Sequence, residues 1–471
     1  MNIISRKVTL SQTIPFLALM AVSIAALFVP AIKDLNDSKI YNSADISWII
    51  VATALVFLMT PGLAFFYGGM VHRKNVLSTM IKSFVAAGVV SVLWVTVGFS
   101  LAFGESIGGI IGNPFSHMFF KGVSSGAPWS LAPTIPLMLF ALFQLMFAII
   151  TPSLVVGAVA ERIRFSSYIL FIVMFSLFVY APLAHWTWNP EGFLFKMGVL
   201  DFAGGTVVHI SAGCAALAGA IVLKRRKVHL EHKEIPPANI PYVLIGTGLL
   251  WFGWFGFNAG SALAANPLAV SAFATTNTAA AAGGLAWMFY DVLKGKKPSV
   301  LGFCIGAVVG LVAITPAAGF VAVPQSIFIG AVAALISNVA VYYKSKSILD
   351  DTLDVFPCHG IGGMVGMLMT GIFASTNVNP GGNDGLFYGN PAFFITQVKG
   401  LVIVVAYSFT VSYGIFKLID LIMPMRVSQE DEEAGLDSSQ HNEKYLQGTL
   451  LVKNNGISTE HERSVFDTHN L

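Results

Sequence analysis

Charged residues are scarce in this chain. Only 11% of its 471 residues are Asp, Glu, Lys or Arg, whereas 55% are hydrophobic. Soluble domains carry about 25% charged residues, so this chain could not cover a water-exposed surface of its own size. The scarcity excludes a soluble globular protein and predicts a surface that faces lipid. The net charge of +3 is small and gives no indication of nucleic-acid binding.

Cysteine is equally rare. The three cysteines, Cys214, Cys304 and Cys358, lie inside or beside apolar runs, and none forms a CxxC pair. This pattern excludes a disulfide framework and a cysteine metal site, and it is typical of small buried side chains. The apolar runs also lack HExxH, a nucleophile elbow and paired carboxylates. We therefore expect no cofactor, no metal and no enzymatic activity.

Long apolar runs are what the chain has in abundance. A membrane-spanning helix needs about 20 mostly apolar residues. Eleven such runs lie near residues 45–70, 79–103, 134–158, 165–187, 201–223, 241–263, 268–293, 299–317, 321–343, 355–375 and 391–424. We predict an all-α polytopic membrane protein with eleven transmembrane helices.

Basic residues gather in alternate loops. Two, Lys121 and Lys196, follow even-numbered runs, whereas fifteen follow odd-numbered runs. The fifteen are Arg73, Lys74, Lys82, Arg162, Arg164, Lys224, Arg225, Arg226, Lys227, Lys233, Lys294, Lys296, Lys297, Lys344 and Lys346. Because cytoplasmic loops are enriched in Lys and Arg, the first run is expected to start outside and the last to end in the cytoplasm. The expected location is the cell (inner) membrane.

The two ends of the chain differ from the membrane domain, which we place at residues 32–425. Arg6 and Lys7 precede an apolar run from Ile14 to Val29. Residues 1–31 therefore resemble a signal peptide, which would leave the mature N-terminus outside; an uncleaved twelfth helix is the alternative. Residues 426–471 are polar and hold too few apolar residues for a core of their own. They are expected to form a cytoplasmic tail.

Two runs share an internal pattern. Asp201 and His209 lie in the fifth run, and Asp354 and His359 in the tenth, with small residues around each histidine. Two halves of five helices must cross the membrane in opposite directions, so the pattern predicts two inverted five-helix repeats plus a final helix, with a path between them. Small residues allow the two helices to approach closely.

The two histidines are the strongest candidates for function. Ionisable residues are expensive inside a membrane and usually functional, although histidines also serve as hydrogen bonds between helices. Neutral imidazole both donates and accepts, so a pair of rings could hold a small uncharged molecule. Asp201 and Asp354 open their helices, and we expect both to cap backbone N–H groups.

Several motifs resemble one known family. They are Pro61-Gly-Leu-Ala-Phe-Phe-Tyr-Gly-Gly69, Glu161-Arg-Ile-Arg-Phe165, Asp201-Phe-Ala-Gly-Gly-Thr-Val-Val-His209, Gly256-Phe-Asn-Ala-Gly-Ser261 and Asp354-Val-Phe-Pro-Cys-His-Gly360. Together they resemble the Amt branch of the Amt/Mep/Rh ammonium transporters over residues 45 to 446. The resemblance implies high-selectivity ammonium/ammonia transport, with methylammonium as an analogue. The alternatives are an ammonium-sensing receptor with little flux and a proton-coupled carrier for a larger amine.

The resemblance also implies a role for individual residues, which aromatic belts alone would not. An outer recruitment site would use Phe147, Trp188 and Ser261, with Trp186 as an alternative to Trp188. The remaining implied members are Trp254 as support, Gln144 beside the site, Phe143 and Phe257 as a stacked gate, His209 and His359 as twin pore histidines, and Phe66, Tyr67 and Val355 at the inner mouth.

The resemblance finally implies partners. The tail from Glu432 to Tyr445 resembles the regulatory C-terminus of the family, except that Asn442 stands where relatives often have glycine. Family members form homotrimers with one pore in each subunit, and some bind PII-type signal proteins at the cytoplasmic face. We expect a homotrimer and, at the cytoplasmic face, a PII-type partner.

Overall fold

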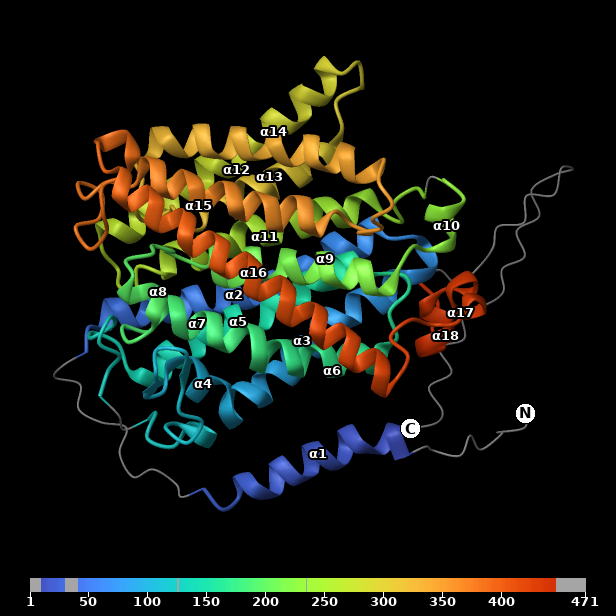
Figure 1. Cartoon of the computed structure of the whole chain (residues 1–471), viewed down its shortest axis with the longest axis horizontal. Helices are drawn as coiled ribbons and strands as arrows, with labels where there is room; N and C mark the ends of the chain where they lie inside the picture. Colours follow the sequence, from blue (N-terminus) through green and yellow to red (C-terminus); the bar gives the residue numbers. More distant parts are fainter. Residues whose placement is uncertain (1–9, 30–40, 125–126, 234, 446–471) are drawn as a thin grey trace, which may run out of the picture.

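The computed structural model describes residues 10–29, 41–124, 127–233 and 235–445. Long helices run side by side and form one bundle (Figure 1). The short helices α10 (Lys227–Leu230), α17 (Gln429–Ala434) and α18 (Leu436–His441) lie together at one end, which we name the tail end. Strands β1 (Ser106–Ile107) and β2 (Ile111–Gly112) pair antiparallel in a loop between bundle helices.

Eleven helical segments occupy the predicted runs. They are α2 (Ser43–Met70), α3 (Val76–Leu93) with η2 (Trp94–Gly98) and α4 (Phe99–Phe103), α5 (Leu137–Val159), α6 (Phe165–Phe175) with η4 (Ser176–Tyr180) and α7 (Ala181–Trp188), η5 (Gly205–Ile210) with α9 (Ser211–Leu223), α11 (Ile240–Gly260), α12 (Pro267–Leu293), α13 (Val300–Ile314), α14 (Val323–Ser345), η6 (Phe356–Ile361) with α15 (Gly362–Phe373), and α16 (Pro391–Ile422). Shorter pieces are η1 (Arg73–Asn75), η3 (Met118–Phe120), α8 (Phe193–Lys196) and η7 (Leu386–Tyr388).

Nine of these segments, within the described residues, are long and apolar enough to cross a membrane. The two other predicted spans coincide with α12 and α13. Helix α12 has 27 residues but is not among the nine, and α13 is apolar but has only 15 residues. A mostly helical fold with helices apolar enough to span a membrane is therefore confirmed, whereas the exact number of spans and the inverted repeat stay predictions.

Local sequence determines where several helices begin. Asn42, Asn239, Asn266, Ser299 and Asn390 each precede a bundle helix, and each side chain accepts a backbone N–H of the first turn. These are the residue types that satisfy the unpaired donors at a helix start. Pro occupies the first or second helical position at three of these starts, where its missing N–H is not needed.

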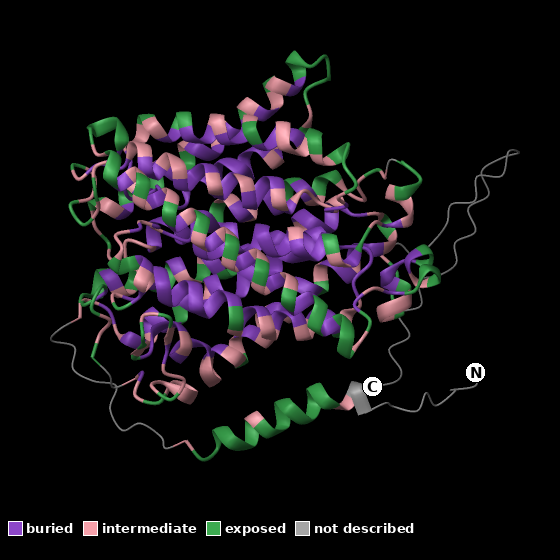
Figure 2. Cartoon of the chain, in the orientation of Figure 1, coloured by how far each residue is buried: buried purple, intermediate pink, exposed green. Residues whose placement is uncertain are grey.

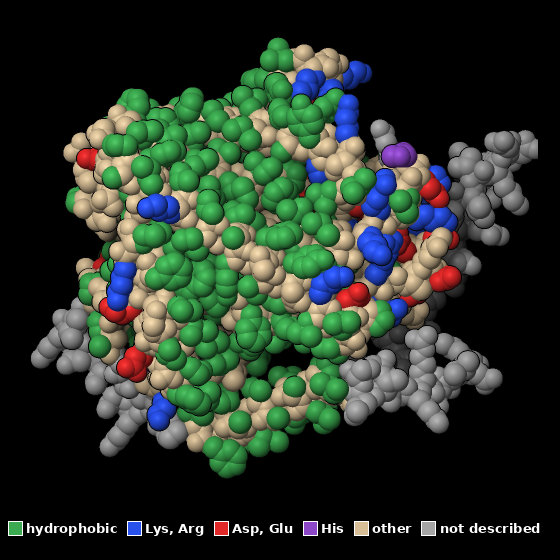
Figure 3. Space-filling model, viewed as in Figure 1, with side chains coloured by type: hydrophobic (Ala, Val, Ile, Leu, Met, Phe, Trp, Pro, Cys, Tyr) green, Lys and Arg blue, Asp and Glu red, His purple; other side chains and the backbone are tan. Residues whose placement is uncertain are grey.

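Burial is graded from the centre of the bundle to its surface. The interior is almost entirely buried, and α5 passes through it with 89% of its most apolar window buried (Figure 2). The face seen in Figure 3 is mostly hydrophobic, with most of its charged side chains toward the two ends. A surface of this kind is stable against lipid, where no water is available to hydrate charges.

Helix α1 (Leu10–Ala26) lies beside the bundle rather than in it (Figure 1). Nearly all of its described side chains are exposed, including Phe16 and Leu19. The apolar N-terminal run is therefore helical, which is compatible both with a signal peptide and with an uncleaved twelfth helix. Residues 1–9 and 30–40, with the expected cleavage region, lie outside the described residues, and so does the tail beyond residue 445.

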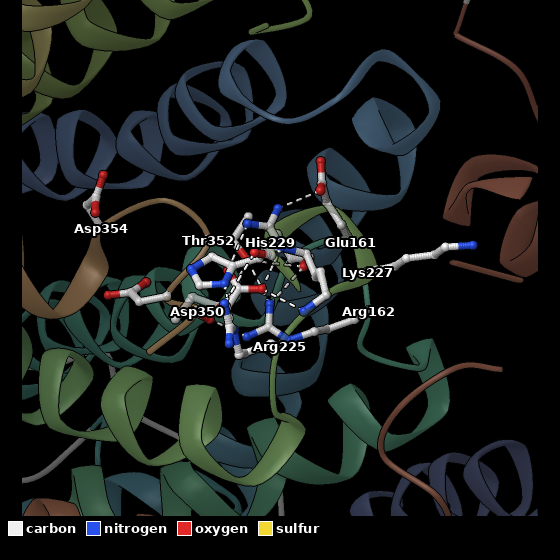
Figure 4. Close-up of polar contacts among 12 residues, drawn as sticks. Glu161, Arg162, Arg225, Lys227, His229, Asp350, Thr352 and Asp354 are labelled. Carbon is white, nitrogen blue, oxygen red and sulfur yellow. Dashed lines mark hydrogen bonds and ion pairs between the residues drawn. The ribbon is translucent and has the colours of Figure 1, made fainter. Parts of the chain in front are cut away.

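A buried ion cluster joins three loops at the tail end (Figure 4). Arg226 Nη1 donates to Glu161 Oε2 at 2.6 Å, and Arg226 Nη2 donates to Asp350 Oδ1 at 2.8 Å. Arg162 Nη2 donates to the Asp350 carbonyl at 2.5 Å. Burial opposes the charge on Asp350, but hydrogen bonds and charge from Arg226 and Arg162 hold its pKa well below the ordinary value. The cluster fixes the loops that follow α5 and α9 and the loop that precedes η6 and α15 relative to one another.

The C-terminal tail folds back onto the start of α3. The Asp437 carboxylate accepts the N–H of Ser78 at 2.7 Å and that of Leu77 at 3.2 Å, so α18 caps a helix that begins far away in sequence. Lys82, expected in a loop, is instead buried inside α3, where Nζ donates to the Ser78 carbonyl. Asn442 has φ +56°, a left-handed conformation that asparagine tolerates better than most residues. The departure from glycine therefore fits the backbone.

We predict that Asp350→Asn lowers stability by about 3 kcal/mol, because breaking a buried pair leaves the Arg226 charge without a full partner. A fall in the thermal unfolding midpoint of the detergent-purified protein would measure it. Glu191→Gln is the matched control: its pair with Lys196 is largely exposed, so its removal should hardly move the midpoint. Equal midpoints for both variants would contradict the prediction.

Candidate functional site

Two helical segments carry the predicted histidines: η5 with α9, and η6 with α15. These two segments, which we name the half-helices, meet backbone to backbone. A side chain on Gly213 of α9 would place its Cβ 2.3 Å from the Cα of Gly360 in η6. A Cβ on Gly363 would similarly lie 3.3 Å from the Cβ of His209. Only glycine permits such proximity. The small residues around each histidine therefore bring the two helices together, as their pattern predicts.

His209 and His359 touch at this crossing. Their Nδ1 atoms are 3.3 Å apart, the ring centroids are 5.4 Å apart, and both side chains are buried. One Nδ1 must donate and the other accept, so the two Nε2 atoms are left with opposite roles. His209 Nε2 has no hydrogen-bond partner among the described residues. Nowhere in the part of the chain that the structure describes are three His, Cys, Asp or Glu side chains grouped to hold a metal ion.

A narrow cavity lies against the histidine pair. Its volume is about 10 Å³, roughly the space for one water-sized molecule. The two imidazoles are its only polar side chains, and the rest of its lining consists of Met59, Leu63, Phe66, Ile150, Leu154, Leu250, Trp254, Phe257 and Val308. Such a space admits a small neutral molecule and offers a bare cation almost nothing to replace its water.

A wider pocket opens at the end of the bundle away from the tail. Phe147, Trp188 and Ser261, the three predicted recruitment residues, all line this cavity of about 360 Å³. Trp188 is held by a hydrogen bond from Nε1 to the Asp201 carbonyl at 3.0 Å. Trp186 lies elsewhere, with Nε1 bonded to the Ile110 carbonyl and its ring against Tyr407. The geometry therefore selects Trp188 over Trp186.

Aromatic rings connect the pocket to the cavity, but the predicted gate pair is wrong. Phe257 packs on Phe147, with centroids 4.3 Å apart, and it also lies near the rings of Trp254 at 5.5 Å and His209 at 5.9 Å. Phe143 meets Phe147 edge-on and packs on Gly260. Spacing along α5 places Phe143 and Phe147 on one face, and only packing determines which of the two reaches Phe257. Trp254 stacks on His209, as a supporting residue should.

The caps of the two half-helices correct a second prediction. Asp201 accepts the backbone N–H groups of Gly204, Gly205 and Thr206 and also the Thr206 hydroxyl, as expected. At the other half-helix, the N–H groups of Val355 and Phe356 donate to Asp351. Asp354 instead pairs with Lys344 Nζ at 2.7 Å and adopts φ +58°. Asp354 lies directly before the helix, where a cap is usual, but its left-handed backbone and its pair with Lys344 keep its carboxylate from the free N–H groups.

The remaining predicted residues lie along the same path. Phe66 lines the histidine cavity. Tyr67 and Val355 meet across Gly157 on the side toward the tail end, and Tyr67 Oη donates to the Leu154 carbonyl at 3.0 Å. Gln144 lines the outer pocket, and its buried Oε1 has no hydrogen-bond partner among the described residues.

Two residues that position the site were not predicted. Thr315 Oγ1 accepts the Trp254 indole N–H at 2.9 Å, which orients the ring stacked on His209. Asp351, described above, caps the half-helix of His359. The Thr315-Pro316 pair is visible in the sequence, but its contact with Trp254 depends on the way α13 packs against α11.

Comparisons with known proteins agree with this geometry. A model described as the Ammonium Transporter Family matches residues 47–445. An ammonium transporter of Aquifex aeolicus is 48% identical over 411 residues, covering 87% of this chain and 94% of that protein. Mep2 of Saccharomyces cerevisiae superimposes with a TM-score of 0.79 at 36% identity, covering 84% of this chain and 90% of that chain. A structure titled Sensor Amt Protein gives 0.77 at 28% identity, covering 84% and 98%.

The helical bundle and its apolar belt define an integral membrane protein. Its buried path and its relatives define the class further, as a transporter rather than an enzyme. The chain belongs to the ammonium transporter family.

We predict that Gly213→Ala lowers uptake of labelled methylammonium in cells by at least about tenfold, because a methyl group must push η6 and His359 away from His209. Gly248→Ala is the control, since nothing lies within 4 Å of its added carbon. Immunoblots of the membrane fraction would show that both variants are present in equal amounts. Unchanged uptake by the Gly213 variant would mean that the close approach is dispensable.

Proposed function

We propose that this protein carries ammonium across the cell membrane by binding the cation at the outer pocket and passing neutral ammonia along the histidine pair. The single observation that supports this most strongly is the pair itself. Two imidazoles in hydrogen-bond contact are the only polar side chains of a cavity that fits one small molecule. The proposal divides into recruitment, proton loss and passage.

Recruitment uses the outer pocket. A cation over the faces of Phe147 and Trp188 gains about 2 kcal/mol when water is displaced. The Ser261 hydroxyl donates to the Phe257 carbonyl at 2.8 Å, so its lone pairs are free to accept an N–H of ammonium. Ammonium has four such donors, whereas potassium has none. The pocket therefore concentrates ammonium without holding it permanently.

Proton loss is required by the next step of the path. Moving an ion of this size from water to a dry medium costs on the order of 20 kcal/mol in an idealised estimate and several kcal/mol in practice. Cation–π contacts return only a small part of that. Desolvation favours the neutral form of a base, so ammonium can release a proton to the water of the outer pocket, forming hydronium, and continue as ammonia. Potassium has no neutral form and is excluded.

Passage relies on the opposite roles of the two Nε2 atoms. Ammonia both donates and accepts hydrogen bonds, and so do the paired neutral rings. A hydrogen-bonding ring nitrogen in an otherwise apolar cavity offsets the loss of water around ammonia, yet it does not hold the ammonia in place. Phe66, Tyr67 and Val355 then line the way toward the tail end.

We predict that proteoliposomes containing the purified protein show ammonium flux well above potassium flux, and that His209→Ala lowers ammonium flux at least about tenfold by removing one handle. Flux is followed by a pH-sensitive dye in the lumen and, for potassium, by a potassium-selective dye. Met59→Leu, a volume-conserving change in the same cavity, is the matched control and should keep most of the flux.

Equal permeation by potassium in the unaltered protein would reject the deprotonation step. Binding of ammonium without measurable flux of any substrate would favour the alternative, an ammonium sensor. Flux of larger amines or amino acids would favour a carrier of broader specificity.

We also predict that Trp188→Leu raises the half-saturating ammonium concentration about 3- to 30-fold, with a smaller effect on maximal flux, because a cation–π contact of about 0.5–2 kcal/mol is lost. Trp188→Phe keeps a ring and should lie between the two. Initial rates of uptake against ammonium concentration measure both constants. A half-saturating concentration that does not move would remove Trp188 from the recruitment site.

Assembly and regulation extend the proposal. We expect a homotrimer with one pore in each subunit and a PII-type protein at the tail end. Docking of α17 and α18 supports a regulatory tail, because Lys227 of α10 pairs with Glu433 and the Lys227 N–H donates to Glu432. A partner that binds this end could reach the tail and the loops at the same time.

A further inference from the structure

The last turn of α7 lines the outer pocket and is also bonded to a different part of the chain. Thr187 and Trp188 line the pocket. His185 and Trp186 bond instead to the end of α4 and to β1, β2 and the turn between them, residues 106–112, which we name the outer hairpin. We propose that His185 is a positioning residue for ammonium recruitment, whose buried ring ties α7 to α4 and the outer hairpin and thereby holds Trp188 in place. This inference rests on the proposed function.

The His185 ring joins two separate points of the chain. Nδ1 lies 2.9 Å from the carbonyl oxygen of Ala102 in α4, and Nε2 lies 2.8 Å from the hydroxyl oxygen of Ser106 in β1. A carbonyl oxygen only accepts, so Nδ1 carries the ring proton and donates it. The Ser106 hydroxyl donates to Nε2, and its oxygen also accepts the Gly109 N–H at 3.1 Å. Both ring nitrogens and the hydroxyl are thereby paired.

The surroundings of His185 require a neutral ring. The side chain is fully buried, and its two partners are a carbonyl and a hydroxyl, neither of which carries a charge. Burying a charge without a charged partner costs far more than burying a neutral group that is hydrogen-bonded. In the neutral ring one nitrogen donates and the other accepts. An asparagine amide could replace only the donor to Ala102, whereas the longer glutamine could replace only the bond to Ser106.

Helix α7 depends on contacts of this kind for its orientation. It has only eight residues and directly follows η4, a π-helical turn that interrupts the regular hydrogen-bond pattern of the helix. Helices α4 and α7 lie side by side (Figure 1). Trp186 Nε1 donates to the Ile110 carbonyl at 2.6 Å, and Asn189 Nδ2 donates to the Gly104 carbonyl at 3.3 Å. The His185 ring is the part of this attachment that reaches both α4 and the outer hairpin.

Trp188 moves with the turn that His185 holds. The indole N–H of Trp188 donates to the Asp201 carbonyl, and its ring meets Phe147 edge-on with centroids 5.9 Å apart. His185 precedes Trp188 by about one helical turn, so a shift of its backbone displaces the indole ring. A cation–π contact weakens as the ring moves away from the cation. Loss of the attachment should therefore lower ammonium affinity, whereas the histidine cavity, which α7 does not line, should keep its shape.

The test is initial ammonium flux against ammonium concentration in proteoliposomes. Ser106→Ala removes the bond to Nε2, and neither Ser106 nor His185 lines the outer pocket. We expect this variant to raise the half-saturating concentration about 3- to 10-fold, with maximal flux nearly unchanged. His185→Asn should raise it at least as much, whereas His185→Gln, which can still meet Ser106, should lie between His185→Asn and the unaltered protein. Ser106→Ala should add nothing further in the His185→Asn background, because the bond is already absent.

Ser130→Ala is the matched control, since it removes a hydroxyl from an exposed position of the same loop between α4 and α5. It should leave both constants unchanged. A lower maximal flux with an unmoved half-saturating concentration, or additive effects of Ser106→Ala and His185→Asn, would overturn the role of His185 and leave the proposed function standing. Absence of saturable ammonium flux in the unaltered protein would instead overturn the proposed function, and this inference with it.

Discussion

The contact between two oppositely directed half-helices is the constraint on which the rest of this structure depends. Gly213 and Gly360 leave no room for a side chain between their backbones. Their approach brings His209 against His359 and leaves only a water-sized space beside the rings. Everything else near the path supports that crossing: Asp201 and Asp351 cap the helix starts, and Thr315 orients the tryptophan that stacks on His209. Inside a membrane the few polar groups must be paired, because each unpaired backbone group there costs several kcal/mol.

In the proposed mechanism, separate parts of the path carry out binding and selection. There, aromatic faces and a hydroxyl attract a cation where water is still present, whereas the cavity below excludes any species that must stay charged. Phe257 belongs to both regions, since its ring contacts Phe147 on one side and His209 on the other. Binding strength and selectivity can therefore change independently, which explains why a substitution in the outer pocket should act on half-saturation and one at the histidines on flux.

Much of the fold and the site could be predicted from the sequence. Membrane segments are recognisable from their apolar composition, and the two histidines stand out because ionisable residues are rare inside such segments. The failures have physical reasons. Spacing on α5 put Phe143 and Phe147 on one face but could not tell which ring reaches Phe257. Asp354 has the right residue type and position for a cap, yet its carboxylate pairs with the distant Lys344, and Asp351 accepts the N–H groups instead. The cluster of Arg226, Glu161 and Asp350 joins three distant loops, and no local pattern predicts such contacts. Lys82 looked like a loop residue because its charge is unusual inside a helix.

The cap that α18 places on α3 has a consequence for the order of biosynthesis. Asp437 and Ser78 are separated by 359 residues, so this hydrogen bond can form only after residue 437 has been synthesised. Until then the first turn of α3 must rely on water or on another group for these N–H donors. A product that is truncated before α18 therefore leaves the ribosome without this cap on α3.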